Sequence, residues 1–186
     1  MSKIAVLGGS FNPPHICHVL ICYYVCATTD VDQIWVVPCY RHAFGKELAP
    51  FQHRLTMCRL AMESLREGLV LVSAIEEDRQ GISWTIDTVR YLRDKYPEHE
   101  FRWIIGSDVL DEFDTWKNVD QLRQLISFIV VPRAGSHDGD PEGFQLPNIS
   151  STLIRERIKQ QKSIHHLVPK KIETYIRLHK LYNNEE

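Results

Sequence analysis

Short apolar runs alternate with longer segments of helical periodicity along most of the chain. The short runs have strand length, and several are apolar throughout, as strands covered on both faces tend to be. They are Lys3–Gly8, Gln33–Pro38, Leu69–Ser73, Phe101–Gly106 and Ile126–Pro132, with Phe144–Asn148 as a weaker sixth candidate. The predicted helices are Ile16–Thr28, Phe51–Arg66, Thr85–Lys95, Asn118–Leu125, Ser151–Gln161 and Pro169–Leu178.

This alternation of strands and helices predicts an α/β fold. Helices that connect buried strands imply right-handed crossovers and therefore a parallel sheet. One domain usually takes roughly 100–200 residues, so we expect a Rossmann-like doubly wound parallel sheet in a single domain, residues 1–186. Such folds bind ligands beyond the carboxyl ends of their strands, where the chemistry is therefore expected. Arg133–Pro147, rich in Gly, Pro and Asp, is predicted to be a mobile surface loop.

The charge balance and the apolar runs narrow the class of protein. Lys and Arg number 22 and Asp and Glu 24, for a net charge of −2, which offers no global attraction to nucleic acid or to an anionic membrane. The longest apolar run, Val19–Ala27, is far shorter than the ~20 residues of a membrane span, and the first residues lack a signal-peptide pattern. We therefore expect a cytoplasmic protein that binds neither nucleic acid nor membrane. Its five cysteines are odd in number and bunched early, which favours reduced thiols.

The exit of the first predicted strand is suited to binding phosphate. Gly8 and Gly9 allow the backbone to approach a phosphate closely, and the helix that follows offers free N–H groups and the positive end of its dipole. His15 and His18 stand three residues apart on its opening turn, so both rings can face one ligand. The joint pattern G-x-F-x-P-x-H-x-x-H therefore favours a polyphosphate site over a simple turn and helix cap.

A second phosphate site is predicted near the end of the chain. Ser150 is suited to cap the helix that starts after it, and Ser151 and Thr152 add hydroxyls beside the open N–H groups of the first turn. Arg155 lies on the same face, so hydroxyls, amides and a guanidinium converge on one anion. Taken alone, this segment also fits an ordinary capped surface helix with an exposed arginine.

Together the two segments resemble the nucleotidyltransferases of the HxGH type, and Ile149–Arg155 is similar to the ISSTxxR signature of nucleotide adenylyltransferases. Two further stretches resemble the bacterial nicotinate-nucleotide adenylyltransferases. Ser83–Thr88 is similar to their S-Y-T-I-D-T stretch, and Ile105–Trp116 is similar to their G-x-D…F…W stretch. The ending, Leu167–Tyr182, is also similar, so the resemblance covers nearly the whole chain.

This resemblance implies an enzyme that transfers AMP from ATP to the 5′-phosphate of nicotinate mononucleotide. The products would be nicotinate adenine dinucleotide and pyrophosphate, within NAD biosynthesis. The resemblance also implies Mg²⁺ bound to the ATP and two small-molecule partners, ATP and nicotinate mononucleotide, and it leaves a homo-oligomer open. Nicotinamide mononucleotide and phosphopantetheine stay open as other acceptors, as does a nucleotide-binding sensor without catalysis.

Residues that match the family's motifs take their expected roles from the resemblance. His15, His18 and Arg155 are the expected catalytic residues at the ATP phosphates. The expected ATP-binding residues are Gly8, Gly9, Ser10, Phe11, Cys17, Gly106, Asp108, Ser150, Ser151 and Thr152. The expected acceptor-binding residues are Lys46, Trp84, Thr85 and Trp116. Because a helix start holds anions, the Thr85 hydroxyl and the amides of the first turn around it would hold the nicotinate carboxylate.

Two positions depart from the family pattern. Cys17 stands where the family has Gly, which narrows the space for adenine, and Gly45 stands where a His usually precedes Lys46. A thiol at a helix N-terminus tends toward a lowered pKa, so Cys17 is also expected to be reactive.

No metal site of the protein's own is expected. The spacing of Cys17, Cys22 and Cys26 fits no common zinc pair, and the last two lie on a helix predicted to be buried. Cys39 and His42 fit a loop better than a pair of metal ligands. The basic tract at 165–171 fits a solvated helix start better than a further phosphate contact.

Overall fold

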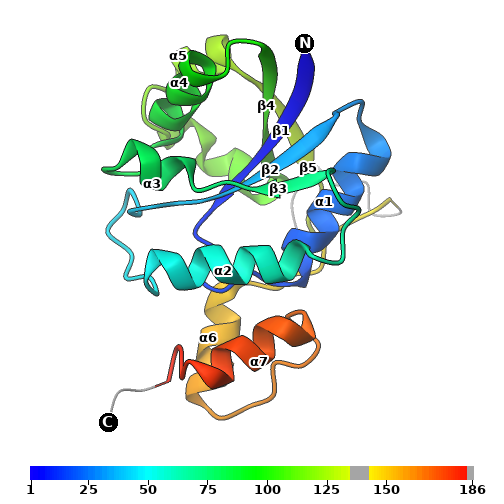
Figure 1. The fold of residues 1–186 in the computed structure, drawn as a ribbon, viewed down its shortest axis with the longest axis vertical. Helices are drawn as coiled ribbons and strands as arrows, with labels where there is room; N and C mark the ends of the chain where they lie inside the picture. The colour runs from blue at the N-terminus through cyan, green and yellow to red at the C-terminus, as the bar shows by residue number, and fades with distance from the viewer. Residues whose placement is uncertain (135–142, 184–186) are drawn as a thin grey trace.

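A five-stranded parallel sheet forms the centre of the computed structural model, which describes residues 1–134 and 143–183 (Figure 1). The strands are β1 (Ser2–Gly9), β2 (Gln33–Pro38), β3 (Val70–Val72), β4 (His99–Gly106) and β5 (Ser127–Val131). Their order is β3-β2-β1-β4-β5, and every neighbouring pair is parallel. The predicted α/β fold with a doubly wound parallel sheet is therefore confirmed.

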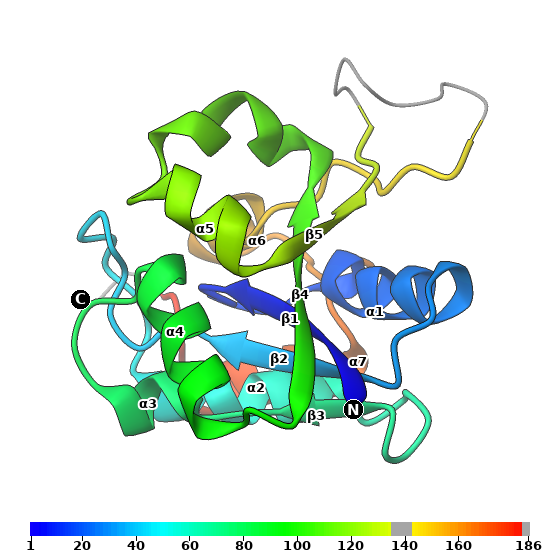
Figure 2. The same cartoon turned by 90° about the horizontal axis from the view of Figure 1, so that it is seen from above.

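Helices cover both faces of this sheet. They are α1 (Ile16–Thr28), α2 (Phe51–Met62), α3 (Ile75–Arg79), α4 (Thr85–Lys95), the 3₁₀ helix η1 (Ser107–Thr115), α5 (Val119–Leu125), α6 (Ser151–Lys159) and α7 (Lys170–Leu178). Figure 2 shows α1 on one side of the strands and α4 with α5 on the other, and Figure 1 shows α7 beside α2. Among the described residues, no helix has both the length and the apolar character of a membrane span.

Alternate residues of the central strand β1 face two different cores. Ala5 and Leu7 pack in the core under α1, α2, α6 and α7, whereas Ile4 and Val6 pack in the core under α4 and α5. Side chains alternate across a strand, so a strand buried on both faces must be apolar at every position. This requirement explains why continuous apolar runs identify the strands in the sequence.

Several predicted elements differ from the structure. Phe144–Asn148 does not form the predicted sixth strand, because only Leu146 pairs, in an isolated bridge with Arg133. Pro147 follows at once and has no N–H to extend the pairing. The helix predicted over Phe51–Arg66 ends at Met62, and the short helices α3 and η1 are not among the predicted ones.

Arg133–Pro147, the predicted mobile loop, lies largely outside the described residues, which omit 135–142. Its first residue is held firmly by the end of β4. The backbone N–H of Arg133 donates to the Ser107 hydroxyl at 2.9 Å, and its side chain binds Asp108 and the carbonyl oxygen of Ile149. The start of the segment is therefore part of the structure around the carboxyl ends of the strands.

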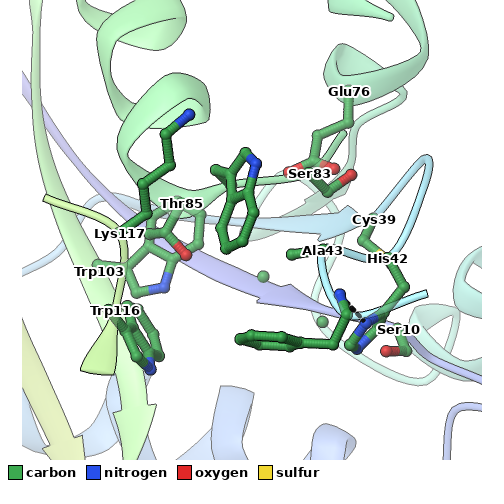
Figure 3. A pocket seen from close by; sticks show the side chains of 14 residues that line it. Ser10, Cys39, His42, Ala43, Glu76, Ser83, Thr85, Trp103, Trp116 and Lys117 are labelled. Atoms are coloured by element: carbon green, nitrogen blue, oxygen red, sulfur yellow. Dashed lines mark hydrogen bonds between the residues drawn. The ribbon is translucent and has the colours of Figure 1, made fainter. Parts of the chain in front are cut away.

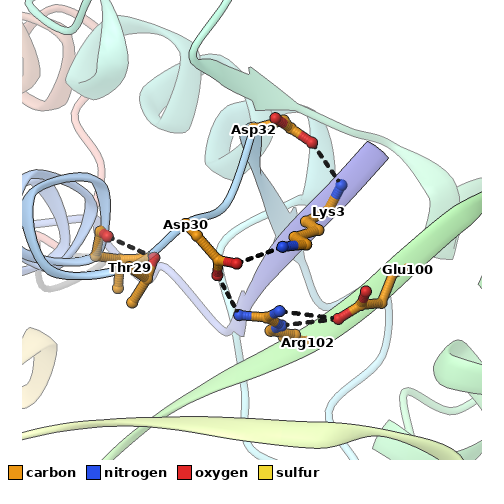
Figure 4. Close-up of polar contacts among 7 residues, drawn as sticks. Lys3, Thr29, Asp30, Asp32, Glu100 and Arg102 are labelled. Atoms are coloured by element: carbon orange, nitrogen blue, oxygen red, sulfur yellow. Dashed lines mark hydrogen bonds and ion pairs between the residues drawn. The ribbon is translucent and has the colours of Figure 1, made fainter. Parts of the chain in front are cut away.

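A network of charged side chains joins β1, β4 and the turn after α1 (Figure 4). Lys3 and Arg102 both donate to Asp30, with Arg102 Nη1 2.7 Å from Asp30 Oδ1. These hydrogen bonds, led by the one from Lys3, lower the pKa of Asp30 to about 2. Arg102 also pairs with Glu100 at 3.0 Å. Because these side chains are all partly exposed to solvent, which screens their charges, the network contributes little to stability.

Candidate active site

Two adjoining pockets lie at the carboxyl ends of β1 and β2, next to the reversal of strand order between β1 and β4. Ser10, the first residue after β1, lines both of them. The polar pocket is lined by Ser10, Phe11, Asn12, His18, Lys46, Glu47, Leu48, Ser151, Thr152 and Arg155. The aromatic pocket (Figure 3) is lined by Gly8, Gly9, Ser10, Cys39, His42, Ala43, Phe44, Glu76, Ser83, Trp84, Thr85, Trp103, Trp116 and Lys117.

The N-terminal turns of α1 and α6 meet at the polar pocket. Arg155 Nη1 donates to the carbonyl oxygen of Asn12 at 2.8 Å, and the Ser151 hydroxyl donates to the carbonyl oxygen of Pro13 at 2.8 Å. These two bonds fix α6 against the loop between β1 and α1. The first amides of a helix have no partner within it and carry the positive end of its dipole, so two such starts together form an anion site.

Some polar side chains at the start of α6 hold the backbone in place, and others line the polar pocket. Ser150 caps the helix, because its Oγ accepts the N–H of Leu153 at 3.1 Å, and it does not line the pocket. The Ser151 hydroxyl donates its hydrogen bond to the carbonyl oxygen of Pro13. Thr152 and Arg155 line the pocket side by side, with Arg155 Nη2 3.2 Å from Thr152 Oγ1. An anion in the pocket would therefore meet the guanidinium, the Thr152 hydroxyl and the backbone amides.

His15 and His18 form a close pair of rings at the start of α1. Their ring centroids are 3.8 Å apart, with an angle of 36° between the planes. The backbone N–H of His15 donates to Nδ1 of His18 at 3.0 Å, so a neutral His18 ring carries its proton on Nε2. His18 lines the polar pocket, whereas His15 is buried, and its Nδ1 has no hydrogen-bond partner among the described residues. The fixed tautomer makes His18 Nε2 a hydrogen-bond donor.

Both imidazoles are neutral at physiological pH. Burial, aided by the charge of Arg133, lowers the pKa of His15 to about 4. Burial also lowers the pKa of His18 well below its ordinary value, with smaller contributions from His15 and Arg133. In the free protein the pair therefore supplies directed hydrogen bonds rather than positive charge.

The segments after β4 and β5 are joined by an ion pair. Arg133 Nη1 lies 2.8 Å from Asp108 Oδ2, and Arg133 Nη2 donates to the carbonyl oxygen of Ile149 at 3.1 Å. Gly106 leaves room for this pair, because a Cβ there would lie 2.2 Å from Asp108 Oδ1 and 3.0 Å from Arg133 Cδ. Gly106 and Asp108 therefore lie together beside Arg133, outside the linings of the polar and aromatic pockets.

The aromatic pocket brings Trp84, Thr85 and Trp116 together from the start of α4 and the end of η1 (Figure 3). Gly8 also lines this pocket, and a Cβ there would lie 2.4 Å from the indole of Trp103. Thr85 is the first residue of α4, so its amide belongs to the unpartnered first turn. Indole side chains beside helical amides suit a flat ring that carries a polar or anionic substituent.

Comparison with known proteins identifies the family. A model of the cytidylyltransferase-like family matches residues 6–157. A probable nicotinate-nucleotide adenylyltransferase of Anaeromyxobacter dehalogenans (strain 2CP-C) is 41% identical over 183 residues, which cover 97% of this chain and 96% of that protein. Another, of Bacillus pumilus (strain SAFR-032), is 36% identical over 99% of this chain and 100% of its own length. The chain belongs to the nicotinate-nucleotide adenylyltransferase family.

Solved structures share the fold of this adenylyltransferase over nearly its whole length. The Plasmodium falciparum nicotinic acid mononucleotide adenylyltransferase complexed with NaAD has a TM-score of 0.84 at 20% identity and covers 98% of both chains. The same protein complexed with APC has a TM-score of 0.82 at 20% identity. The likeness places the doubly wound fold among those of nicotinate-nucleotide adenylyltransferases.

Cys17 is not the reactive thiol that its place at a helix start predicts. Its side chain is 1% exposed, and its Sγ donates to the carbonyl oxygen of Pro147 at 3.4 Å. Burial raises its pKa, although Arg133 acts in the opposite direction. The predicted lowering of the pKa is wrong because desolvation of the thiolate outweighs the favourable field.

Lys46, expected among the acceptor-binding residues of the adenylyltransferase, lines the polar pocket and not the aromatic one. Gly45, which precedes it, has a φ of +64°. Glycine populates this left-handed region without strain. Glycine is therefore suited to the backbone conformation that directly precedes Lys46 at the polar pocket.

A buried arginine that the motifs do not reveal holds the loops of this site together. Arg54, on α2, is 1% exposed and donates to the carbonyl oxygens of Ser10 at 3.0 Å, Cys39 at 2.7 Å and Ala49 at 2.8 Å. It thereby links the loop after β1 to the loop after β2. An arginine among the apolar positions of α2 is the signal that points to it in the sequence.

Three further residues in or next to the two pockets are not among those predicted from the sequence. Arg133 directly follows the fifth predicted strand. Because such folds bind ligands beyond the carboxyl ends of their strands, its position in the sequence could have identified it. Lys117 and Glu76 line the aromatic pocket. Lys117 follows Trp116 with no motif of its own, and Glu76 lies on the unpredicted helix α3.

Proposed function

We propose that this protein transfers AMP from ATP to the 5′-phosphate of nicotinate mononucleotide, forming nicotinate adenine dinucleotide and pyrophosphate in NAD biosynthesis. One observation carries the proposal: an anion site between two helix starts adjoins an aromatic pocket, and Ser10 lines both. A dinucleotide has the same layout, because its phosphates lie between two ring systems.

In this proposal the ATP phosphates lie in the polar pocket, where they meet the Nε2–H of His18, the Arg155 guanidinium and the first amides of α1 and α6. Gly106 and Asp108 lie at the ATP sugar, and Cys17 lies beside the adenine. The described residues contain no group of three or more His, Cys, Asp or Glu side chains suited to a metal ion. Mg²⁺ is therefore proposed to arrive on the ATP phosphates as part of the substrate.

The reaction needs no general base. A phosphate monoester has a second pKa of about 6, so the attacking oxygen of the acceptor is already largely deprotonated at neutral pH. A bond forms from this oxygen to the α-phosphorus of ATP as the bond to pyrophosphate breaks. The protein's part is to align these groups and to stabilise the negative charge on the phosphate oxygens. His18 suits this part, because its Nδ1 is occupied by the His15 N–H and its Nε2 can only donate.

The acceptor's ring is proposed to lie in the aromatic pocket. Trp84 and Trp116 supply faces for stacking the pyridine ring, and the Thr85 hydroxyl and first-turn amides of α4 meet its carboxylate. Lys46, in the polar pocket, is placed to meet the acceptor's phosphate. All five cysteines are free thiols, which fits the cytoplasmic location that we also propose.

The decisive experiment measures pyrophosphate release and dinucleotide formation from ATP with each of three acceptors. We expect nicotinate mononucleotide to give at least a tenfold higher kcat/KM than nicotinamide mononucleotide, and phosphopantetheine to give no product. A higher kcat/KM with either other acceptor would reassign the substrate. Binding of ATP with no release of pyrophosphate in the presence of any of the three acceptors would make the protein a nucleotide sensor.

A further inference from the structure

Lys117 brings to the aromatic pocket a positive charge that has no part in the transfer of AMP itself. Its Nζ lies 5.4 Å from the centre of the Trp84 ring and 2.9 Å from Oδ2 of Asp87. Figure 3 shows its side chain on the same side of the pocket as Thr85 and Trp116. The ammonium therefore stands next to the groups proposed to hold the ring and its substituent.

Among the described residues that line this pocket, Lys117 carries the one full positive charge. Burial lowers the pKa of His42, so its ring is neutral at physiological pH. The Glu76 carboxylate is already bound on both oxygens, by the Thr88 hydroxyl at 2.7 Å and by the N–H of Tyr40 at 3.0 Å. The Glu76 carboxylate is thus held by Thr88 and Tyr40. Lys117 is therefore the charged group of this lining that can bind a ligand.

The ion pair with Asp87 does not cancel the charge of Lys117. Arg90 Nη1 also approaches Asp87, at 3.7 Å from its Oδ1. Two cations therefore share one carboxylate, and the group of three keeps a net charge of +1. An ammonium has three donors, so Lys117 can bind a second carboxylate while it keeps the contact with Asp87.

The two pyridine mononucleotides differ in charge at the end that enters this pocket. In both, the ring nitrogen bonded to ribose is quaternary and positive. Nicotinate adds a carboxylate, which makes its ring group neutral overall, whereas nicotinamide adds a neutral amide and leaves the ring group at +1. A fixed ammonium attracts the carboxylate of nicotinate and repels the positive ring of nicotinamide. The same group therefore favours binding of nicotinate and disfavours binding of nicotinamide.

We propose that the Lys117 ammonium is a specificity-determining group that selects nicotinate over nicotinamide. This inference rests on the proposed function and deepens it. Lys117 acts together with the first-turn amides of α4, which are neutral donors and distinguish the substituents by hydrogen bonding alone. The face of Trp84 beneath the ammonium keeps the side chain over the pocket.

The test compares Lys117→Met and Lys117→Arg with the wild type, using nicotinate and nicotinamide mononucleotides at saturating ATP. In Lys117→Met the kcat/KM for nicotinate mononucleotide should fall at least tenfold, equivalent to ~1.4 kcal/mol, and the kcat/KM for nicotinamide mononucleotide should fall less than threefold or rise. The loss for nicotinate should appear mainly as a higher KM, because the carboxylate does not react. Lys117→Arg, which keeps the charge, should hold the ratio of the two kcat/KM values within threefold of the wild type.

Lys95→Met is the matched control. Lys95 also pairs with an aspartate, at 3.1 Å from Asp78, and its Nζ also lies 5.4 Å from an aromatic ring centre, that of Tyr91. Its side chain is 38% exposed against 40% for Lys117, but it does not line the aromatic pocket. We expect Lys95→Met to keep the wild-type preference between the two acceptors within twofold.

The inference is overturned if Lys117→Met keeps the wild-type preference, if it weakens both acceptors equally, or if Lys117→Arg loses the preference as fully as Lys117→Met. Wild-type activity separates this failure from that of the proposed function. A wild type that forms no dinucleotide from nicotinate mononucleotide refutes the function itself. A wild type that prefers nicotinate, with a Lys117→Met variant that does so equally, refutes only the role of Lys117.

Discussion

The buried guanidinium of Arg54 offers the sharpest test of how the site is held together. Its three short hydrogen bonds all go to backbone carbonyl oxygens, of Ser10, Cys39 and Ala49. These residues belong to the loops after β1 and β2, which line both pockets. Replacing Arg54 by Met keeps an unbranched apolar stem in the core but removes every donor.

The size of the effect can be worked out from the carbonyl groups that lose their donor. A buried polar group without a partner costs ~1–3 kcal/mol, so three such groups give about 3 kcal/mol even at the low end of that range. A chain of this size loses ~2–4 °C of Tm for each kcal/mol. We therefore expect Arg54→Met to lower Tm by roughly 6–12 °C and to raise the KM for ATP, because the loop that lines the polar pocket loses its anchor.

Thermal unfolding followed by circular dichroism measures the first effect, and initial rates of pyrophosphate release measure the second. Arg59→Met is the control, because Arg59 lies on the same helix α2 but is exposed. It should keep Tm within about 1 °C of the wild type, as surface substitutions usually stay within ~0.5 kcal/mol. An Arg54→Met protein as stable as Arg59→Met would refute the structural role given to the guanidinium.

Three further predictions concern the residues around the polar pocket. His18→Ala and Arg155→Ala should each lower kcat by ~10²-fold or more with the fold retained in circular dichroism, whereas His18→Gln, which keeps an N–H donor, should lose less. An equal loss in His18→Gln and His18→Ala would mean that donation from the ring is not its role. Because the pKa of His15 in the folded protein is lowered to about 4, its unfolded form binds more protons between that value and ~6.5. Wild-type stability should therefore fall as pH drops through this window more steeply than that of His15→Gln, and parallel urea midpoints would contradict the assignment. Cys17 should react with iodoacetamide at least tenfold more slowly than free cysteine at pH 7.5, measured by peptide mass spectrometry, and a rate equal to that of free cysteine would contradict its burial.

The central strands were predictable because a strand buried on both faces must be apolar at nearly every position. β1 is buried on both faces, so its apolar run leaves no ambiguity about its place in the sheet. The weak sixth strand had no such support: Leu146 is buried and pairs once, but exposed Phe144 and Pro147 flank it. Helix α3 has five residues, too few for the 3.6-residue period to appear.

The candidate site also contains features that depend on local sequence and features that depend on the whole fold. The capping role of Ser150 depends only on its neighbours, and the structure confirms it. The contacts of Arg54 with Ser10 and Cys39, by contrast, join segments that come together only when the sheet forms. The raised pKa of Cys17 likewise depends on burial by a distant segment, including the carbonyl oxygen of Pro147.

The histidine pair shows how such long-range contacts change the chemistry of a motif. Two histidines at a helix start suggest positive charge for a polyphosphate, yet burial and the nearby Arg133 keep both rings neutral. Positive charge at the polar pocket comes instead from the guanidinium of Arg155 and the ammonium of Lys46. Since His18 Nδ1 is bound to the His15 N–H, the ring offers the same Nε2 donor whenever it is neutral. Positive charge and a directed donor are thus supplied by different residues, so the hydrogen bond that we propose from His18 to the phosphates would stay constant across the pH range in which the acceptor's phosphate is deprotonated.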